Sequence, residues 1–315
     1  MAKSYTTGRA LAGTLTKNTA TANLTYLDQV ANDDYRRICA LKDWPFLTRN
    51  RTISTTASTQ FTTLPYDCDQ VREISVIPTG STIRYTPREV TSRTEWDELN
   101  LRTYTSDIPE RFYVFAGQVG LWPTPASTGN TIYVTQKTRV IDLSAADYTM
   151  GSITTSATTA GVTTLTGNGT TWSTSMVGRW IRITYTDAAA SLVGDGQWYE
   201  IASVPTTTTM TLVRTYGGTT IAAATAAYMI GQMPLLPEAF HDLPWLWAVG
   251  TYWQKEADKR AGSFFDQHGS AGEGGRAPTG KVKELINAYS SKSTDMVVDD
   301  GGDHSFINPN LTVQL

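Results

Sequence analysis

The chain has 315 residues and a formal net charge of −3, and charged side chains make up only 17% of it. This length accommodates about two domains with a sizeable buried core. The slight acidic excess argues against a dedicated nucleic-acid-binding protein, which would carry a basic patch or stripe. Threonine and serine replace the missing charge, and this composition favours strands with neutral polar faces. Such faces suit packed assemblies, because few charges need to be desolvated at the contacts.

A membrane protein and a secreted disulfide-rich protein are also not indicated. No apolar run approaches the roughly 20 residues that span a bilayer, and residues 1–13 lack the pattern of a signal peptide. Cys39 and Cys68 fit neither a disulfide framework nor a metal-ligand spacing. We interpret both as packing residues of a protein assembled under reducing conditions.

Residues 19–41 carry the first helical pattern. Apolar side chains recur there at spacings of three and four, with Asp34 as the polar exception on that face. The apolar positions are Leu24, Leu27, Val30, Ala31, Ile38 and Leu41. We expect the helix to stop near Trp44, because the residue before a proline disfavours the helical conformation.

Strand patterns dominate from residue 51 to residue 143. A short polar turn separates the first two strands, which predicts a hairpin, and Gly117-Gln118 predicts a second, tight hairpin. Ser92 followed by Glu95 has the capping-box pattern, which predicts a short helix over residues 92–99. The predicted strands are 51–56, 60–64, 71–77, 83–86, 111–116, 119–122 and 131–143.

The composition changes near residue 150, and residues 151–230 are rich in Thr, Gly and Ala. Turn residues separate short strand candidates there at close intervals, which is typical of a small sandwich or barrel. The candidates are 162–166, 180–185, 198–204, 210–214 and 227–230. We therefore predict an all-β module over residues 150–231, inserted into a host domain.

Helical patterns return behind this module. Residues 243–257 have three-and-four spacing, with Asp242 as the expected cap and Gly250 leaving room for a second helix. The last helix is predicted over residues 281–289, and residues 291–315 read as an extended arm with a strand-capable tip.

The predicted fold class is α+β. A helical bundle with an antiparallel β-domain carries the inserted all-β sandwich or barrel. The host core is expected to be discontinuous, comprising residues 1–149 and 232–290.

We predict no catalytic, cofactor-binding or metal-binding residue, and the chain is not expected to be an enzyme. Gly275 to Lys281 has the glycine and lysine spacing of a phosphate-binding loop, but Val282 stands where a hydroxyl is needed and no buried strand precedes it. His241, His268 and His304 lie far apart without a metal-binding spacing, which favours surface or cap roles.

Two further groups of side chains give weaker indications of function. Glu95, Asp97 and Glu98 are interpreted as a solvated helix face. A carbohydrate-binding role for the inserted module is a competing hypothesis, and it would use Trp172, Trp180 or Trp198.

Aromatic residues supply the candidates for subunit contacts, because such residues are enriched at the centres of interfaces. Trp247 and Trp253 share one face of their helix and are expected in the core, whereas Trp245 points elsewhere. The predicted interface residues are Trp245, Trp96 and Tyr252.

Several loose motifs resemble one family through their order and spacing. They are residues 23–47 with Trp44-Pro45-Phe46-Leu47, residues 64–74 beginning Leu64-Pro65-Tyr66-Asp67, residues 109–113, residues 120–125, residues 236–242 and a long second helix including residues 252–265. Together they are similar to the head-to-tail adaptors of tailed bacteriophages, including the tubular-protein-A type. The resemblance covers residues 20–145 and 232–290, and residues 150–231 depart from it.

The resemblance implies a virion structural protein of the neck, between head and tail, assembled in the host cytoplasm. Such adaptors form rings of about twelve copies that dock on the portal protein and contact a tail or nozzle protein. Genomic DNA would pass through the ring during packaging and ejection without sequence-specific binding, and no membrane is involved. Another neck or tail subunit, such as a nozzle, tube or fibre-attachment protein, is the alternative.

The resemblance also implies that the C-terminal arm reaches the portal. The apolar side chains expected to bind there are Phe306, Ile307, Leu311, Val313 and Leu315.

Overall fold

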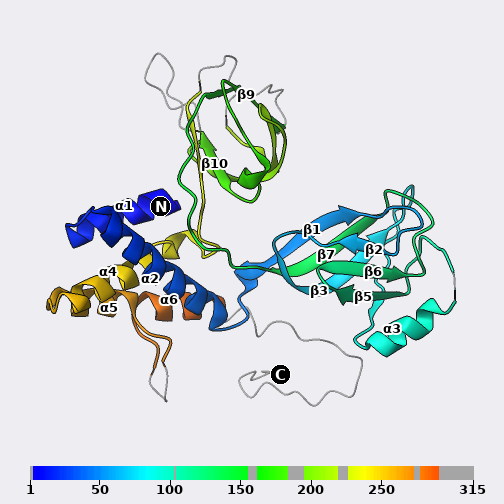
Figure 1. Cartoon of the computed structure of the whole chain (residues 1–315), viewed down its shortest axis with the longest axis horizontal. Helices are drawn as coiled ribbons and strands as arrows, with labels where there is room; N and C mark the ends of the chain where they lie inside the picture. Colours follow the sequence, from blue (N-terminus) through cyan, green and yellow to red (C-terminus); the bar gives the residue numbers. More distant parts are fainter. Residues whose placement is uncertain are drawn as a thin grey trace, which may run out of the picture.

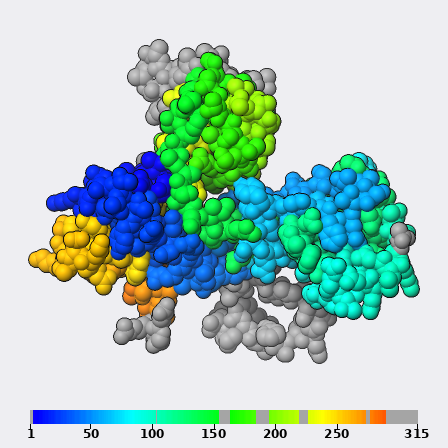
Figure 2. All heavy atoms as spheres, viewed as in Figure 1, coloured from blue at the N-terminus to red at the C-terminus, as the bar shows by residue number. Residues whose placement is uncertain are grey.

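The computed structural model describes residues 3–102, 104–154, 162–183, 195–218, 226–272 and 277–290. A helical unit lies at one end of the molecule and a β-unit at the other, with a barrel-like sheet projecting between them (Figure 1). The space-filling view shows the same separate lobes, joined where the three parts meet (Figure 2). Each lobe has its own hydrophobic core. The α+β class predicted from the sequence is confirmed.

The helical unit is assembled from both ends of the described chain. Its elements are α1 (Tyr5–Thr16), α2 (Thr21–Ala40), α4 (Leu243–Lys255), α5 (Arg260–His268) and α6 (Gly280–Ser290). Helix α2 matches the predicted first helix, with Leu27, Ala31 and Ile38 in the core. The last two predicted helices are also present, and Pro244 lies in the first turn of α4 as expected.

Helix α1 was not predicted, because its Thr and Gly content weakens the helical signal. Tertiary packing stabilises it instead. Ser4 caps the helix by accepting a hydrogen bond from the backbone N–H of Thr7, and Gly8 lies directly against the indole of Trp245 in α4. A β-carbon at Gly8 would come within 2.0 Å of the Trp245 Nε1 atom. The contact between α1 and α4 therefore requires glycine at this position.

The long second helix implied by the resemblance is broken. Helix α4 ends at Lys255, Ala257 adopts a left-handed backbone conformation with φ of 53°, and α5 begins at Arg260. The reversal brings the Phe265 ring onto Gly250, where a β-carbon would lie 2.8 Å from it. The close helix approach expected at Gly250 is thus confirmed, and its partner is the next helix along the chain.

The β-unit contains two sheets packed over a shared core. One sheet has the order β1-β7-β3, with β1 (Thr48–Ser54), β7 (Thr131–Thr138) and β3 (Cys68–Ile77). The other has the order β2-β6-β5-β4, with β2 (Phe61–Thr63), β6 (Gln118–Trp122), β5 (Arg111–Phe115) and β4 (Arg88–Glu89). Helix α3 (Arg93–Asn100) begins at the predicted cap, Ser92.

The first predicted hairpin is wrong. Strand β1 pairs with β7, whereas β2 pairs with β6 in the other sheet. The polar segment between them is fixed by long-range bonds: the Thr55 backbone N–H donates to the Asn130 carbonyl, and the Thr55 hydroxyl donates to the Ser127 carbonyl. These bonds direct the chain from one sheet to the other. The second predicted hairpin, formed by β5 and β6, is confirmed.

The barrel-like sheet has the strand order β13-β10-β11-β12-β9-β8. Its strands are β8 (Ser152–Thr154), β9 (Val162–Asn168), β10 (Trp180–Ile183), β11 (Trp198–Thr206), β12 (Thr209–Tyr216) and β13 (Tyr228–Gly231). Isolated bridges from Ile153 to Ala226 and from Tyr148 to Ile230 nearly close it. The sequence left sandwich and barrel open, and strand pairing favours the barrel-like arrangement.

Replacing Gly8 by alanine should lower the thermal unfolding midpoint measured by circular dichroism. The new β-carbon collides with Trp245, and overpacking of this kind costs about 1–3 kcal/mol. The matched control is Gly262→Ala in α5, where a β-carbon meets nothing within 4 Å. That change should be neutral or stabilising by up to about 1 kcal/mol. Equal shifts in the two variants would contradict the contact.

Candidate functional site: the barrel junction and the exposed surfaces

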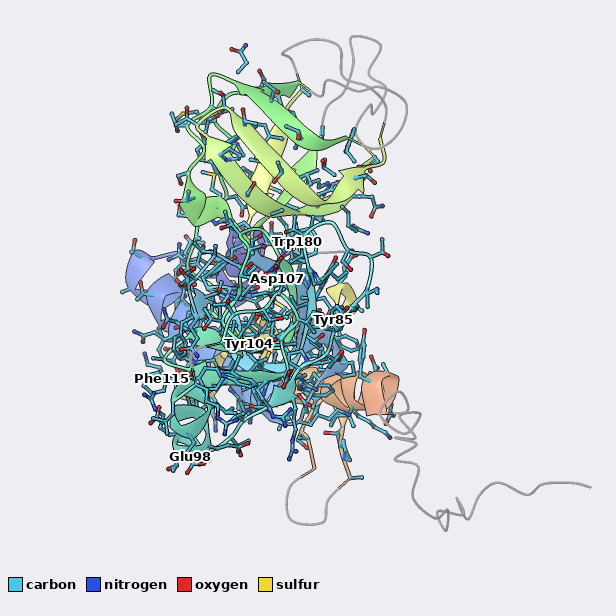
Figure 3. All side chains as sticks on the ribbon, turned by 90° about the vertical axis from the view of Figure 1, so that its right-hand side faces the viewer. Tyr85, Glu98, Tyr104, Asp107, Phe115 and Trp180 are labelled. Carbon is cyan, nitrogen blue, oxygen red and sulfur yellow. The ribbon has the colours of Figure 1, made fainter. Side chains whose placement is uncertain are left out.

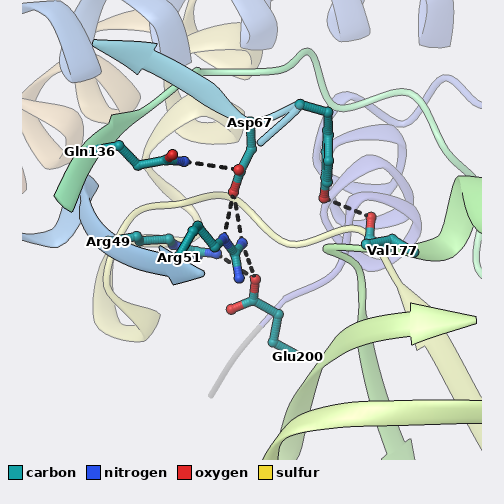
Figure 4. Close-up of polar contacts among 7 residues, drawn as sticks. Arg49, Arg51, Asp67, Gln136, Val177 and Glu200 are labelled. Atoms are coloured by element: carbon teal, nitrogen blue, oxygen red, sulfur yellow. Dashed lines mark hydrogen bonds and ion pairs between the residues drawn. The ribbon is translucent and has the colours of Figure 1, made fainter. Parts of the chain in front are cut away.

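The junction between the barrel and the β-unit is held by a charged network (Figure 4). Arg51 on β1 donates to Asp67 at 2.7 Å and to Glu200 on β11 at 2.8 Å. Arg49 donates to the same Glu200 oxygen at 2.6 Å, and the Gln136 amide donates to Asp67 at 2.9 Å. One barrel carboxylate is therefore shared by two arginines of the neighbouring sheet.

Burial makes this network important for the relative position of the two lobes. Asp67 is 4% exposed and Glu200 is 8% exposed. Desolvation is the largest influence on Arg51 and lowers its pKa, but hydrogen bonds and charge from both carboxylates raise the pKa above its ordinary value. The guanidinium thus stays charged, and removing it would leave two buried carboxylates with fewer partners.

Two uncharged contacts support the same junction. The Tyr66 hydroxyl donates to the Val177 carbonyl of the barrel at 3.1 Å. It lies over Gly178, where a β-carbon would come within 2.2 Å of the hydroxyl oxygen and where φ is +78°. The chain segments that enter and leave the barrel are also joined, because the Gln232 side chain accepts hydrogen bonds from the backbone N–H groups of Ser144 and Ala145.

A second candidate surface lies at the far end of the β-unit. A groove of about 500 Å³, the distal groove, runs between α3 and the second sheet. Two large aromatic residues that line it are exposed, Tyr104 at 54% and Phe115 at 50%. Figure 3 shows Tyr104 and Phe115 on this face. Exposed aromatic side chains beside a groove are typical of a docking surface.

The predicted interface residues occupy different environments. Trp245 and Trp96 are each 1% exposed, so their rings are covered within the chain. Trp245 lies under α1, and Trp96 stacks on Tyr113 beneath the distal groove. Tyr252 packs half-buried against the helical core. Their role between subunits stays a prediction, as does that of the arm residues 306–315, which lie outside the described residues.

The surface role expected for two histidines is wrong. His268 is fully buried, with Nε2 at 2.9 Å from an Asp34 oxygen and Nδ1 at 2.7 Å from the Gly269 carbonyl. This contact explains the polar exception on the buried face of α2. His241 is 6% exposed, and burial lowers its pKa. Its Nδ1 accepts from the Lys3 backbone N–H, so Nε2 donates to the Leu236 carbonyl and the ring is neutral.

The tryptophans of the barrel differ in their accessibility. Trp172 is 1% exposed and donates to the Tyr228 hydroxyl inside the barrel core, so it offers no surface to a carbohydrate. Trp180 and Trp198 are half-buried on the outer face. Figure 3 places Trp180 where the barrel meets the rest of the molecule.

Other candidate chemistry receives no support within the ranges that the structure describes. They contain no group of three or more His, Cys, Asp or Glu side chains that could hold a metal ion. No helix in the described part of the chain combines the length and apolarity needed to cross a membrane. Gly275 and Arg276 of the phosphate-loop lookalike lie outside that part. The carboxylates of α3 are exposed, as predicted.

Residues 7–153 match the SU10 adaptor protein family. This segment covers somewhat less than half of the chain. It includes α1 from Thr7 onwards, α2 and both sheets of the β-unit, and it stops where the barrel begins. No curated protein matches the chain. The match supports a phage adaptor protein with a structural rather than a catalytic role.

Replacing Arg51 by alanine should destabilise the protein by about 3–5 kcal/mol, because a buried ion pair loses one partner. We expect faster hydrogen exchange in β1 and β11 together with a lower unfolding midpoint. The control is Arg93→Ala, which removes a surface pair with Asp97 in which both side chains are 56% exposed. That change should leave the unfolding midpoint nearly unchanged, because exposed ion pairs are screened by water and salt. Similar effects of the two variants would contradict the junction.

The buried neutral His241 should make stability fall as the pH decreases from 7 to 5. The unfolded chain takes up a proton near pH 6.5, the approximate ordinary pKa of histidine, whereas the folded pKa is lowered. The free energy of unfolding is measured by urea titration for the native chain and for His241→Gln at both pH values. The native chain should lose more stability than the variant. Parallel losses would show that His241 does not contribute.

Proposed function

We propose that this chain is a virion structural protein of a tailed phage, a head-to-tail adaptor that docks on the portal as a ring and joins it to the tail. The observation that carries the proposal is the match of residues 7–153 to the SU10 adaptor protein family. The match includes α2 and the two sheets of the β-unit, which form the host part of the chain.

The arrangement of the lobes supports a connecting role. The helical unit and the distal groove lie at opposite ends of the molecule, which leaves two separated surfaces for different neighbours (Figure 1). The exposed aromatic side chains of the groove, Tyr104 and Phe115, suit a protein partner. We assign the distal groove to the tail or nozzle side and the helical unit with the C-terminal arm to the portal side.

Ring formation follows from repetition of one contact. A heterologous side-to-side contact closes a ring when its rotation divides a full turn, and we propose about twelve copies. The net charge of −3 is consistent with a wall that DNA passes without being gripped. Portal binding by Leu311, Val313 and Leu315 would add a strand to an open sheet edge of the neighbour.

The chain is proposed to divide into a host core, residues 1–149 and 232–290, and an inserted module, residues 150–231. Separate hydrophobic cores for the helical unit and the barrel support this division. The family match ends at the start of the barrel, which is consistent with an addition to a shared host architecture.

The test is the native mass of this chain, alone and mixed with the portal ring from the same genome. Addition of about a dozen copies to the portal ring is expected. A variant lacking residues 303–315 should keep the circular dichroism spectrum of the full chain and lose binding, because the arm supplies the portal contact. No added mass at any ratio, with the portal ring intact, would overturn the proposal and favour a position further along the neck or tail.

A further inference from the structure

A cleft of about 470 Å³ lies between the outer face of the barrel and the segment that leads into α4. The pairing of β10 with β11 defines one wall. Trp180 lies opposite Glu200, and Arg182 lies opposite Trp198. These four side chains share the outer face because Ile181 and the alternate residues of β11 point into the barrel core. Two indole rings and an arginine are thus displayed side by side.

The arginines of this cleft are not equivalent. Arg49 is paired with Glu200 at 2.6 Å. Arg182 and Arg214 form no ion pair with any residue in the described ranges. The Arg182 guanidinium lies over the Trp198 ring at 6.0 Å from its centroid, and its buried Nε atom has no hydrogen-bond partner. Arg214 donates to the Trp198 carbonyl at 3.2 Å and keeps further N–H groups.

The charged side chains that line the cleft are Arg49, Arg182, Arg214 and Glu238. Arg49 is engaged by Glu200, and His241 is neutral, so Arg182 and Arg214 are the cationic groups that face a ligand. With the Glu238 carboxylate they leave an excess of about one positive charge, which suits a ligand with a single carboxylate. A polyphosphate or a nucleic-acid strand would bring several negative charges against that carboxylate.

We propose that this cleft binds an acidic saccharide, a sugar ring that carries a carboxylate. The apolar face of the ring packs on Trp198 or Trp180, and the carboxylate pairs with Arg182 and Arg214. Gln197 lines the same cleft and supplies an amide group for the sugar hydroxyls. The volume falls in the range of about 300–1,000 Å³ that small-ligand sites occupy.

This inference goes beyond the adaptor role and does not depend on it. Strands β10 and β11 lie outside the segment that matches the adaptor family. The two proposals can fail separately. The native-mass measurement tests the adaptor role, and the titration below tests saccharide binding.

The test is isothermal titration of the full chain with methyl galacturonide, which carries one carboxylate, and with methyl galactoside as the matched neutral sugar. Saturable binding of methyl galacturonide alone is expected. Arg182→Gln should weaken this binding at least tenfold, because the carboxylate loses a cationic partner. Trp198→Ala should also weaken it at least tenfold, because the sugar ring loses an aromatic surface. Arg88→Gln, an exposed arginine on β4, is the control and should leave binding unchanged.

Circular dichroism of each variant distinguishes loss of binding from loss of folding. If Trp198→Ala does not fold, the result for Arg182→Gln decides the test. Absence of saturable methyl galacturonide binding at millimolar concentration overturns the proposal. Equal binding of methyl galactoside overturns the role of the carboxylate. Binding that persists in both variants overturns the site, and binding of an acidic peptide or a mononucleotide in place of the saccharide overturns the ligand class.

Discussion

The arrangement of this molecule depends on a small number of buried charges at one junction. Arg51 connects Asp67 of its own β-unit with Glu200 of the barrel, and Arg49 holds Glu200 from the same strand. Charged pairs of this kind are strongly directional, and they are costly to break when they are shielded from water. The barrel is therefore fixed against the β-unit at one defined position, and the cleft on its outer face exists only because of that position.

The helical unit closes without the barrel. Its core combines residues 5–47 with residues 236–285, which lie on either side of the barrel in the sequence. Gln232 holds the entering and leaving segments together at the base of the barrel. Each lobe then buries its own apolar residues, and the surfaces between lobes remain free for polar contacts and partners.

Part of the candidate site was predictable. The sequence offered Trp172, Trp180 or Trp198 for carbohydrate binding and placed all three in the β-module, but Trp172 is buried in the barrel core. That Arg182 forms no ion pair with the residues that the structure describes was not predictable, because it depends on which residues surround the barrel. The distal groove was missed for a similar reason: Tyr104 lies in an irregular segment without periodicity, and only the fold shows that it lines the same groove as Phe115.

The sequence by itself determined the elements whose local pattern agrees with their environment, such as α2, α3, the β5–β6 hairpin and strands β9 to β13 of the barrel. Periodicity and turn residues act over short distances, so they report these features directly. Only the tertiary structure decided which strands pair, as β1 with β7 in place of β2, and why Asp34 is polar on a buried face. Those outcomes depend on contacts between residues far apart in the chain, such as Asp34 with His268 and Gly8 with Trp245, which no local pattern encodes.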